Sequence, residues 1–153
     1  MADRPLANHL ERLRRLLPAV WFGLLLCVAA LASPIPFEQL PRPDAGRLNG
    51  VLFQREAWVS VAVALLLWAL ERGRARRAAE AGQGSVLSAE MVLLMGTLLC
   101  TVAGYFALQP LLAAAREGQG SWSFGQLHAV SVGCFVLKGV LAGALAWRAT
   151  RPG

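Results

Sequence analysis

The sequence predicts an all-α membrane protein: a four-transmembrane-helix antiparallel bundle with both termini cytoplasmic and a short N-terminal amphipathic segment. The first observation is the composition. Of the 153 residues, 56% are hydrophobic and only 16% are charged, so the chain is more apolar than a usual soluble domain. The second is a mean hydropathy of +0.50. The third is that the charges lie at the chain ends and between long apolar segments, as in multi-span membrane proteins.

Residues 1–17 are predicted to form a cytoplasmic amphipathic arm. Leucines recur in it at helical spacing while arginines occupy the other faces, and such a helix lies on a membrane surface. The alternative is a helical extension of the first span. The apolar stretch that follows is longer than the core of a signal peptide, so no cleavage is expected.

The four-helix transmembrane domain is predicted over residues 18–147, followed by a cytoplasmic tail at 148–153. Span 1 is placed at about 18–33. It is expected to end there because Pro34 and Pro36 each lack an N–H and restrict the residue before them. The polar segment after it contains Asp44, which is a suitable residue for a helix N-cap.

Span 2 is placed at about 51–70. Its charge-free part, residues 57–70, is about 21 Å long as a helix, which is short of a hydrocarbon core of about 30 Å. The helix must therefore begin earlier, and this puts Arg55 and Glu56 about one turn inside it. Neighbours in sequence do not face each other on a helix, so each needs another partner or must reach the interface.

Span 3 is placed at about 89–108 and span 4 at about 124–147. Pro110 is expected to end or kink span 3. Span 4 contains Lys138 near its middle, where the ammonium either snorkels to the interface or meets a buried partner or a water-filled cavity.

The arginines predict the orientation. Ten of the 15 basic residues fall in the N-terminal arm, the 71–84 loop and the C-terminal tail, whereas the two opposite loops are balanced. In a four-span topology these three segments share one side, which the positive-inside rule makes the cytoplasm. The ten are Arg4, Arg12, Arg14, Arg15, Arg72, Arg74, Arg76, Arg77, Arg148 and Arg151.

Small residues indicate where helices meet. Gly139 and Gly143 in span 4, and Gly96 and Gly104 in span 3, recur at the spacing that lets backbones approach closely in lipid. The three cysteines all lie inside apolar spans without a C-x-x-C motif, so we expect no disulfide framework.

Several function classes are disfavoured. The net charge of +6 does not indicate nucleic acid, because the arginines lie at the ends of spans and suit lipid head groups. No acidic residue is expected near the membrane midplane, which argues against small proton-coupled exporters. A single histidine within a span is too few for a two-histidine haem site in a monomer. No metal-site spacing, Walker loop or serine elbow is present.

The densest set of polar residues within the spans is expected at the outer side, where alternating helices bring their ends together. Ionisable residues inside a membrane are functional candidates, although each of these also has a plain structural explanation as a bundle contact or interfacial anchor. The predicted ligand or structural polar cluster is His128, Ser131, Gln109, Tyr105, Arg55 and Glu56.

His128 is expected to face inward, about one turn inside span 4. Because an unsatisfied buried polar group costs about 1–3 kcal/mol, the imidazole needs a partner there. Pro110 supplies no N–H to the Phe106 carbonyl. Either that carbonyl or the Gln109 side chain is therefore predicted to share a hydrogen bond with His128.

Three segments resemble a known family. These are residues 33–37 (SPIPF) with 45–53 (AGRLNGVLF), residues 105–110 (YFALQP) with Arg116, and residues 124–131 (FGQLHAVS). Together they resemble the bacterial membrane proteins of domain of unknown function 4149, related to the eukaryotic transmembrane protein 205-like family. The resemblance covers roughly residues 18–147 and implies a four-helix membrane domain but no known reaction. Residues 54–57 (QREA) depart from it.

The leading hypothesis is a small non-enzymatic protein of the bacterial inner (cytoplasmic) membrane that binds a partner or a small ligand at the outer-side polar cluster. A small transporter or channel-like oligomer is the first alternative. A haem- or quinone-binding redox subunit that uses His128 is the second, and otherwise no cofactor or metal is expected. The expected partners are the lipid bilayer and a second copy or another membrane protein, without nucleic acid.

Overall fold

The computed structural model describes residues 3–83 and 85–150, and within them the secondary structure is entirely helical. Four helical stretches are long and apolar enough to cross a membrane, so the chain is a multi-pass membrane protein. The elements are α1 (Asp3–Cys27), η1 (Val28–Ala32, π-helical), α2 (Ile35–Gln39), α3 (Arg42–Glu80), α4 (Ala89–Thr101), η2 (Val102–Ala107, π-helical), α5 (Leu108–Arg116) and α6 (Phe124–Ala149).

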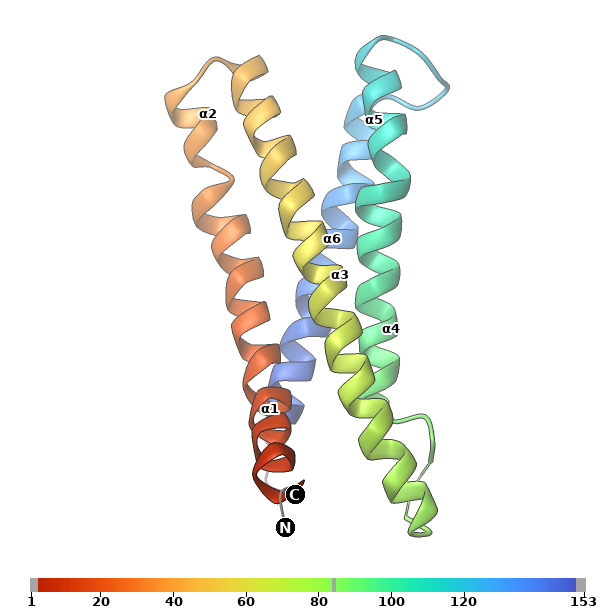
Figure 1. The fold of residues 1–153 in the computed structure, drawn as a ribbon. Helices are drawn as coiled ribbons and strands as arrows, with labels where there is room; N and C mark the ends of the chain where they lie inside the picture. The colour runs from red at the N-terminus through yellow and green to blue at the C-terminus, as the bar shows by residue number, and fades with distance from the viewer. Residues whose placement is uncertain (1–2, 84, 151–153) are drawn as a thin grey trace.

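The long helices run side by side, and the two chain termini are at the same end (Figure 1). The connection from α3 to α4 is also at this end, which we call the termini end. The opposite end, which we call the distal end, contains α2, α5 and the loop that leads into α6 (Figure 1). The described part of the basic arm and the basic residues 71–80, which were predicted as a loop but form the last part of α3, therefore lie at one end of the bundle (Figure 1).

The first helix continues from the predicted arm into the first span without a break. α1 runs from Asp3 to Cys27, and Pro18 lies inside it. Arg14 donates to Glu71 of α3 across 2.7 Å, and this ion pair fixes the arm to the bundle. The described part of the predicted arm, residues 3–17, is thus helical and continuous with the first span.

α3 begins nine residues before the predicted start of span 2. Its N-cap is Pro41, without a side-chain cap, so the expectation that Asp44 caps this helix is wrong. Asp44 lies instead in the first turn, where its carboxylate pairs with Arg47. Pro43 also lies in this turn, where its fixed φ favours helix formation and its missing N–H costs nothing.

Both π-helical segments come just before a proline. A proline ring displaces the carbonyl four residues before it; for Pro34 that residue is Ala30 in η1, and for Pro110 it is Phe106 in η2. The helix widens there and then continues. Pro110 therefore leaves the third span helical as far as Arg116, and the first span resumes as the short α2 after a turn.

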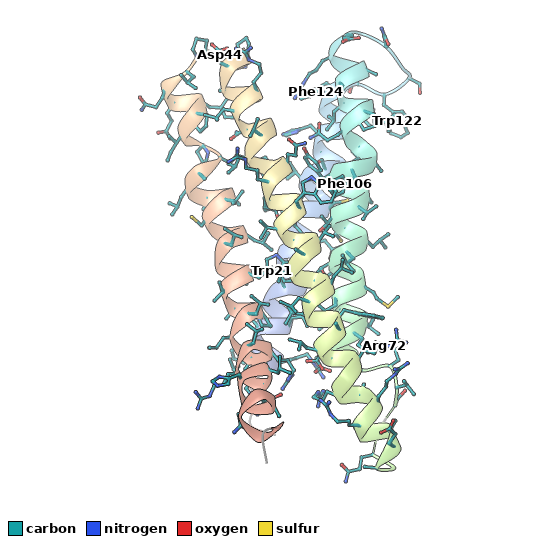
Figure 2. The ribbon with its side chains drawn as sticks, in the orientation of Figure 1. Trp21, Asp44, Arg72, Phe106, Trp122 and Phe124 are labelled. Atoms are coloured by element: carbon teal, nitrogen blue, oxygen red, sulfur yellow. The ribbon has the colours of Figure 1, made fainter. Side chains whose placement is uncertain are left out.

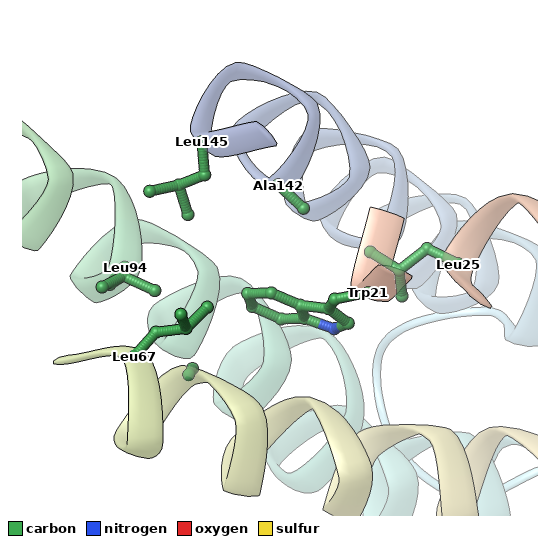
Figure 3. Close-up of a cluster of buried hydrophobic side chains, with 7 residues drawn as sticks. Trp21, Leu25, Leu67, Leu94, Ala142 and Leu145 are labelled. Atoms are coloured by element: carbon green, nitrogen blue, oxygen red, sulfur yellow. The ribbon is translucent and has the colours of Figure 1, made fainter. Parts of the chain in front are cut away.

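A hydrophobic core joins the four long helices (Figure 3). Trp21 and Leu25 from α1 are each 1% exposed and pack against residues of the other three helices. Because this contact is continuous from α1 to α6, it holds the bundle together toward the termini end. The other members are Ala64, Leu67, Leu94, Ala142 and Leu145.

Three of the four small residues predicted at helix contacts do lie against another helix. A Cβ on Gly104 would be 2.4 Å from the Cys134 Cβ, and one on Gly96 would be 2.9 Å from Leu141. A Cβ on Gly143 would be 3.2 Å from Phe22 of α1. Gly139, in contrast, has nothing within 4 Å of its would-be Cβ, so this position is not a helix contact.

Candidate functional site

A cavity of about 310 Å³ lies in the distal half of the bundle. We call it the polar cavity. Both π-helical segments contribute to its wall, and such segments are frequent at functional sites. It is lined by Ala29 and Ser33 at the end of the first span, by Gly46, Gly50, Phe53 and Glu56 from α3, by Cys100, Thr101, Gly104, Tyr105, Gln109, Leu112 and Arg116 from α4 to α5, and by Phe124, His128, Ser131, Val132, Phe135, Val136 and Lys138 from α6.

A buried ion pair forms part of the cavity wall. The Lys138 ammonium donates to both carboxylate oxygens of Glu56, across 2.7 and 2.8 Å, and the two side chains are 4% and 3% exposed. The ammonium also lies 4.7 Å from the centre of the Phe135 ring. Each charge therefore has its counter-charge inside the bundle, as a charge removed from water requires.

Glu56 and Lys138 meet because they lie at equal depth. Glu56 is the fifteenth residue of α3 and Lys138 the fifteenth of α6, and each is about 21 Å from the distal start of its helix. The expectation that Glu56 lies only one turn inside its helix is therefore wrong, because α3 begins at Arg42. The chain does place a carboxylate deep in the bundle, so the argument against proton-coupled exporters does not hold.

A chain of hydrogen bonds connects this ion pair to the core. The Trp21 indole N–H donates to the Ser60 hydroxyl across 2.9 Å, and that hydroxyl donates to Glu56. Trp21, Ser60 and Glu56 are all buried. The carboxylate thus accepts hydrogen bonds from Ser60 of α3 and Lys138 of α6. Trp21 of α1 supports it indirectly, through its hydrogen bond to Ser60. Neither Trp21 nor Ser60 was among the predicted site residues. Ser60 lies one helical turn after Glu56, and this spacing is a signal in the sequence, whereas Trp21 is 39 positions from Ser60 and gives none.

The structure brings five of the six predicted cluster residues together. Tyr105, Gln109, His128, Ser131 and Glu56 all line the polar cavity. Arg55 is exposed and does not line it, because its neighbour Glu56 occupies the inward face of α3 and adjacent residues point in different directions. Lys138, which was not part of the predicted cluster, belongs to this site.

His128 has other neighbours than those predicted. Its ring is stacked on Phe124, with 5.7 Å between centroids and 8° between planes. Within the described part of the chain, no hydrogen bond joins His128 to Gln109 or to the Phe106 carbonyl, so that prediction is wrong. The backbone contact between these helices comes from Ser131 instead, whose hydroxyl donates to the Gly104 carbonyl across 2.7 Å.

Ion pairs join all four long helices at the termini end. Arg14 of α1 pairs with Glu71 of α3, and Arg74, which also pairs with Glu71, lies 3.7 Å from Glu90 of α4. Glu90 pairs in turn with Arg148 of α6 across 2.8 Å. The bundle is thus closed by the core and these ion pairs at the termini end, whereas the distal half contains the cavity.

The donor set of the described residues does not form a metal centre: they include no group of three or more His, Cys, Asp or Glu side chains able to hold a metal ion. Cys100 and the half-buried Cys134 lie on the facing sides of α4 and α6, and Cys27 is exposed.

Comparison with known proteins gave one match. A family model described as a domain of unknown function (DUF4149) matches residues 16–121, which is more than half of the chain. The match includes the C-terminal part of α1, from residue 16 on, and all elements from η1 to α5, but it leaves out α6 and with it the 124–131 segment. No curated protein and no solved structure matched.

Proposed function

The chain belongs to the DUF4149 family, a domain family of unknown function, and from that premise we propose that it is a non-enzymatic binding protein of the bacterial cytoplasmic membrane. Its site is the polar cavity, which takes up one small ligand. The observation on which this proposal rests is a cavity that four of the predicted polar residues line together with a buried, paired Glu56.

The lining has the composition of a ligand site. Pockets that bind small molecules are mostly apolar with a few convergent polar groups, and they begin at about 300 Å³. Here Phe53 and Phe135 pack edge to face at 5.5 Å and form an apolar wall. Gln109, Tyr105 and His128 add hydrogen-bonding groups toward the distal end. A buried ion pair with this much space beside it is also unusual, because its charges are costly in a membrane.

Filling the cavity should remove binding. Gly50 lines the cavity and has nothing within 4 Å of its would-be Cβ, so Gly50→Phe can place its ring in the open space without a backbone clash. The probe is decanol with a diazirine in its chain, photoactivated with the purified protein in phosphatidylcholine nanodiscs. Peptide mass spectrometry should find labels on the cavity segments of the wild type and few on those of Gly50→Phe.

Gly133→Phe is the matched control for this experiment. Gly133 also has open space at its would-be Cβ, but it does not line the cavity, so the labelling should match that of the wild type. Cavity labelling that is equally strong in Gly50→Phe, or none in the wild type, would contradict the proposed function.

A small transporter is the second candidate, favoured by the unequal ends of the bundle. The polar cavity leads from the distal half to Glu56, and beyond Glu56 the core and the ion pairs of the termini end close the path. A transporter would have to open this closed path at the termini end. Release of a trapped, water-soluble dye from proteoliposomes that depends on Glu56 would favour transport over binding.

The orientation belongs to the same proposal. We infer that the distal end lies outside and the termini end in the cytoplasm, because ten of the 15 basic residues fall in the N-terminal arm, the 71–84 segment and the C-terminal tail of the sequence. Reporter fusions after residues 45, 80, 120 and 153 should therefore report outside, inside, outside and inside. A reporter at residue 153 that is found outside would contradict this orientation.

A further inference from the structure

The charges of the polar cavity do not cancel. Three charged residues line it: Glu56, Lys138 and Arg116. Both oxygens of Glu56 are occupied by Lys138, and one of them also accepts from Ser60. Arg116 has no carboxylate within ion-pair distance among residues 3–83 and 85–150. The cavity therefore has one surplus positive charge, which a negative group on a ligand would balance.

The surplus charge is held in place at the distal end. The Arg116 guanidinium lies 4.9 Å from the centre of the Phe124 ring, and Phe124 is stacked on His128. Stacking orients a guanidinium, and the N–H donors in the plane of the guanidinium stay free to bind a carboxylate or phosphate. Gln109 lines the same cavity and provides a further amide donor. Arg116 offers only donors, and the side chains of Gln109 and His128 can each add one.

The cavity is also open to the bilayer. Val132 and Val136 line it, and yet they are 47% and 58% exposed. They lie about 12 and 18 Å along α6 from its start, a depth at which the surroundings are acyl chains. α1 packs on α6 in the core toward the termini end, whereas α2 packs on α3. η1 and α6 therefore pack little against each other, and this is the side on which Val132 and Val136 are exposed.

We propose that the ligand is an amphiphile with an anionic head group, a carboxylate or a phosphate, that enters from the bilayer between η1 and α6. Arg116, His128 and Gln109 bind the head group, and the alkyl chain lies along Val132, Val136 and Phe135. This inference rests on the proposed function and adds the chemical class of the ligand to it.

The test compares head groups on one alkyl chain. Decanoate, decyl phosphate, decanol and decyltrimethylammonium each compete with the photoreactive decanol for cavity labelling in phosphatidylcholine nanodiscs. Inorganic phosphate is a fifth competitor that separates a free anion from a lipid-like one. In the wild type the two anionic amphiphiles should compete about tenfold more strongly than decanol, the gain of one charge-assisted hydrogen-bonded contact. The cation should compete least, and inorganic phosphate should not compete.

Arg116→Gln should abolish the advantage of the anionic competitors and leave competition by decanol unchanged. Arg72→Gln is its matched control, because Arg72 is stacked on Trp68 at 5.0 Å much as Arg116 is on Phe124. Arg72 and Phe124 lie toward opposite ends of the bundle (Figure 2), so the control should behave as the wild type.

Equal competition by all four amphiphiles would overturn the anionic class and leave the proposed function intact, provided that Gly50→Phe still abolishes labelling. If inorganic phosphate competed as strongly as decyl phosphate, the proposal that the ligand is an amphiphile would be wrong. An equal loss in Arg116→Gln and Arg72→Gln would overturn the role of Arg116, since it would show a general effect of surface charge. Labelling that is insensitive to Gly50→Phe would instead contradict the proposed function itself.

Discussion

Lys138→Met is expected to lower the free energy of unfolding by about 3–5 kcal/mol, the usual cost when one partner of a buried ion pair is removed. Met has nearly the volume of Lys, so packing is preserved. What remains is a Glu56 carboxylate that is 3% exposed. It has lost both hydrogen bonds from the Lys138 ammonium, and only the Ser60 hydroxyl still donates to it. Glu56→Gln should destabilise the bundle for the same reason, because it leaves the Lys138 ammonium without a counter-charge.

The double variant Glu56→Gln/Lys138→Met separates charge from packing. It leaves no buried charge, and its Gln side chain still accepts from Ser60, so much of the lost stability should return. A double-mutant cycle in detergent, with thermal unfolding as the readout, should yield a coupling well outside the error of additivity. Additive effects of the two substitutions would show that the pair does not interact energetically.

The exposed ion pair between Arg148 and Glu90 is the control. Its 2.8 Å distance is close to that of the buried pair, but its arginine side chain is 39% exposed. An ion pair exposed to water contributes about 0–1 kcal/mol, so Arg148→Met should cost little. If Arg148→Met destabilised the protein as much as Lys138→Met does, burial would not explain the effect.

Gly104→Ala is expected to destabilise the bundle by about 1–3 kcal/mol, the cost of overpacking a close contact. The new Cβ would be 2.4 Å from the Cys134 Cβ, and two Cβ atoms cannot rotate out of each other's way. η2, which contains Gly104, and α6 would have to separate. This movement would also stretch the 2.7 Å hydrogen bond from Ser131 to the Gly104 carbonyl.

Gly139→Ala is the matched control for that change. Nothing lies within 4 Å of the would-be Cβ of Gly139, and Ala favours a helix over Gly by about 1 kcal/mol. Its melting temperature should be unchanged or slightly higher, whereas that of Gly104→Ala should fall. The compensating change Cys134→Gly should restore part of the loss in Gly104→Ala. Equal melting temperatures for the two alanine variants would contradict the close contact of η2 with α6.

Much of the fold was predictable because the membrane acts on local composition. Long apolar runs gave rise to the prediction of four spans, and the structure has four helices able to cross a membrane. The resemblance to the DUF4149 family is confirmed over residues 16–121. The polar cluster was predictable in part, since Tyr105, Gln109, His128 and Ser131 lie near the helix ends that the alternation of spans brings together.

The helix ends were less predictable, because hydropathy reports the part of a helix that suits hydrocarbon and not the whole helix. α3 extends from Arg42 to Glu80, well beyond the predicted span. Its true start moves Glu56 from the expected outer level to the depth of Lys138. A small error in a boundary thus changed the assigned environment of an ionisable residue.

By itself the sequence predicted that the chain is helical, that it has four apolar spans, and that ten of its 15 basic residues fall in the two terminal segments and the 71–84 segment. Only the tertiary structure decided which residues meet: Glu56 with Lys138, 82 positions apart, Gly104 with Cys134, and Arg14 with Glu71. The physical reason is that burial of an apolar run depends on nearby residues alone. The rotation and the vertical offset of one helix against another depend instead on side chains of both helices, and these offsets determine every contact between them.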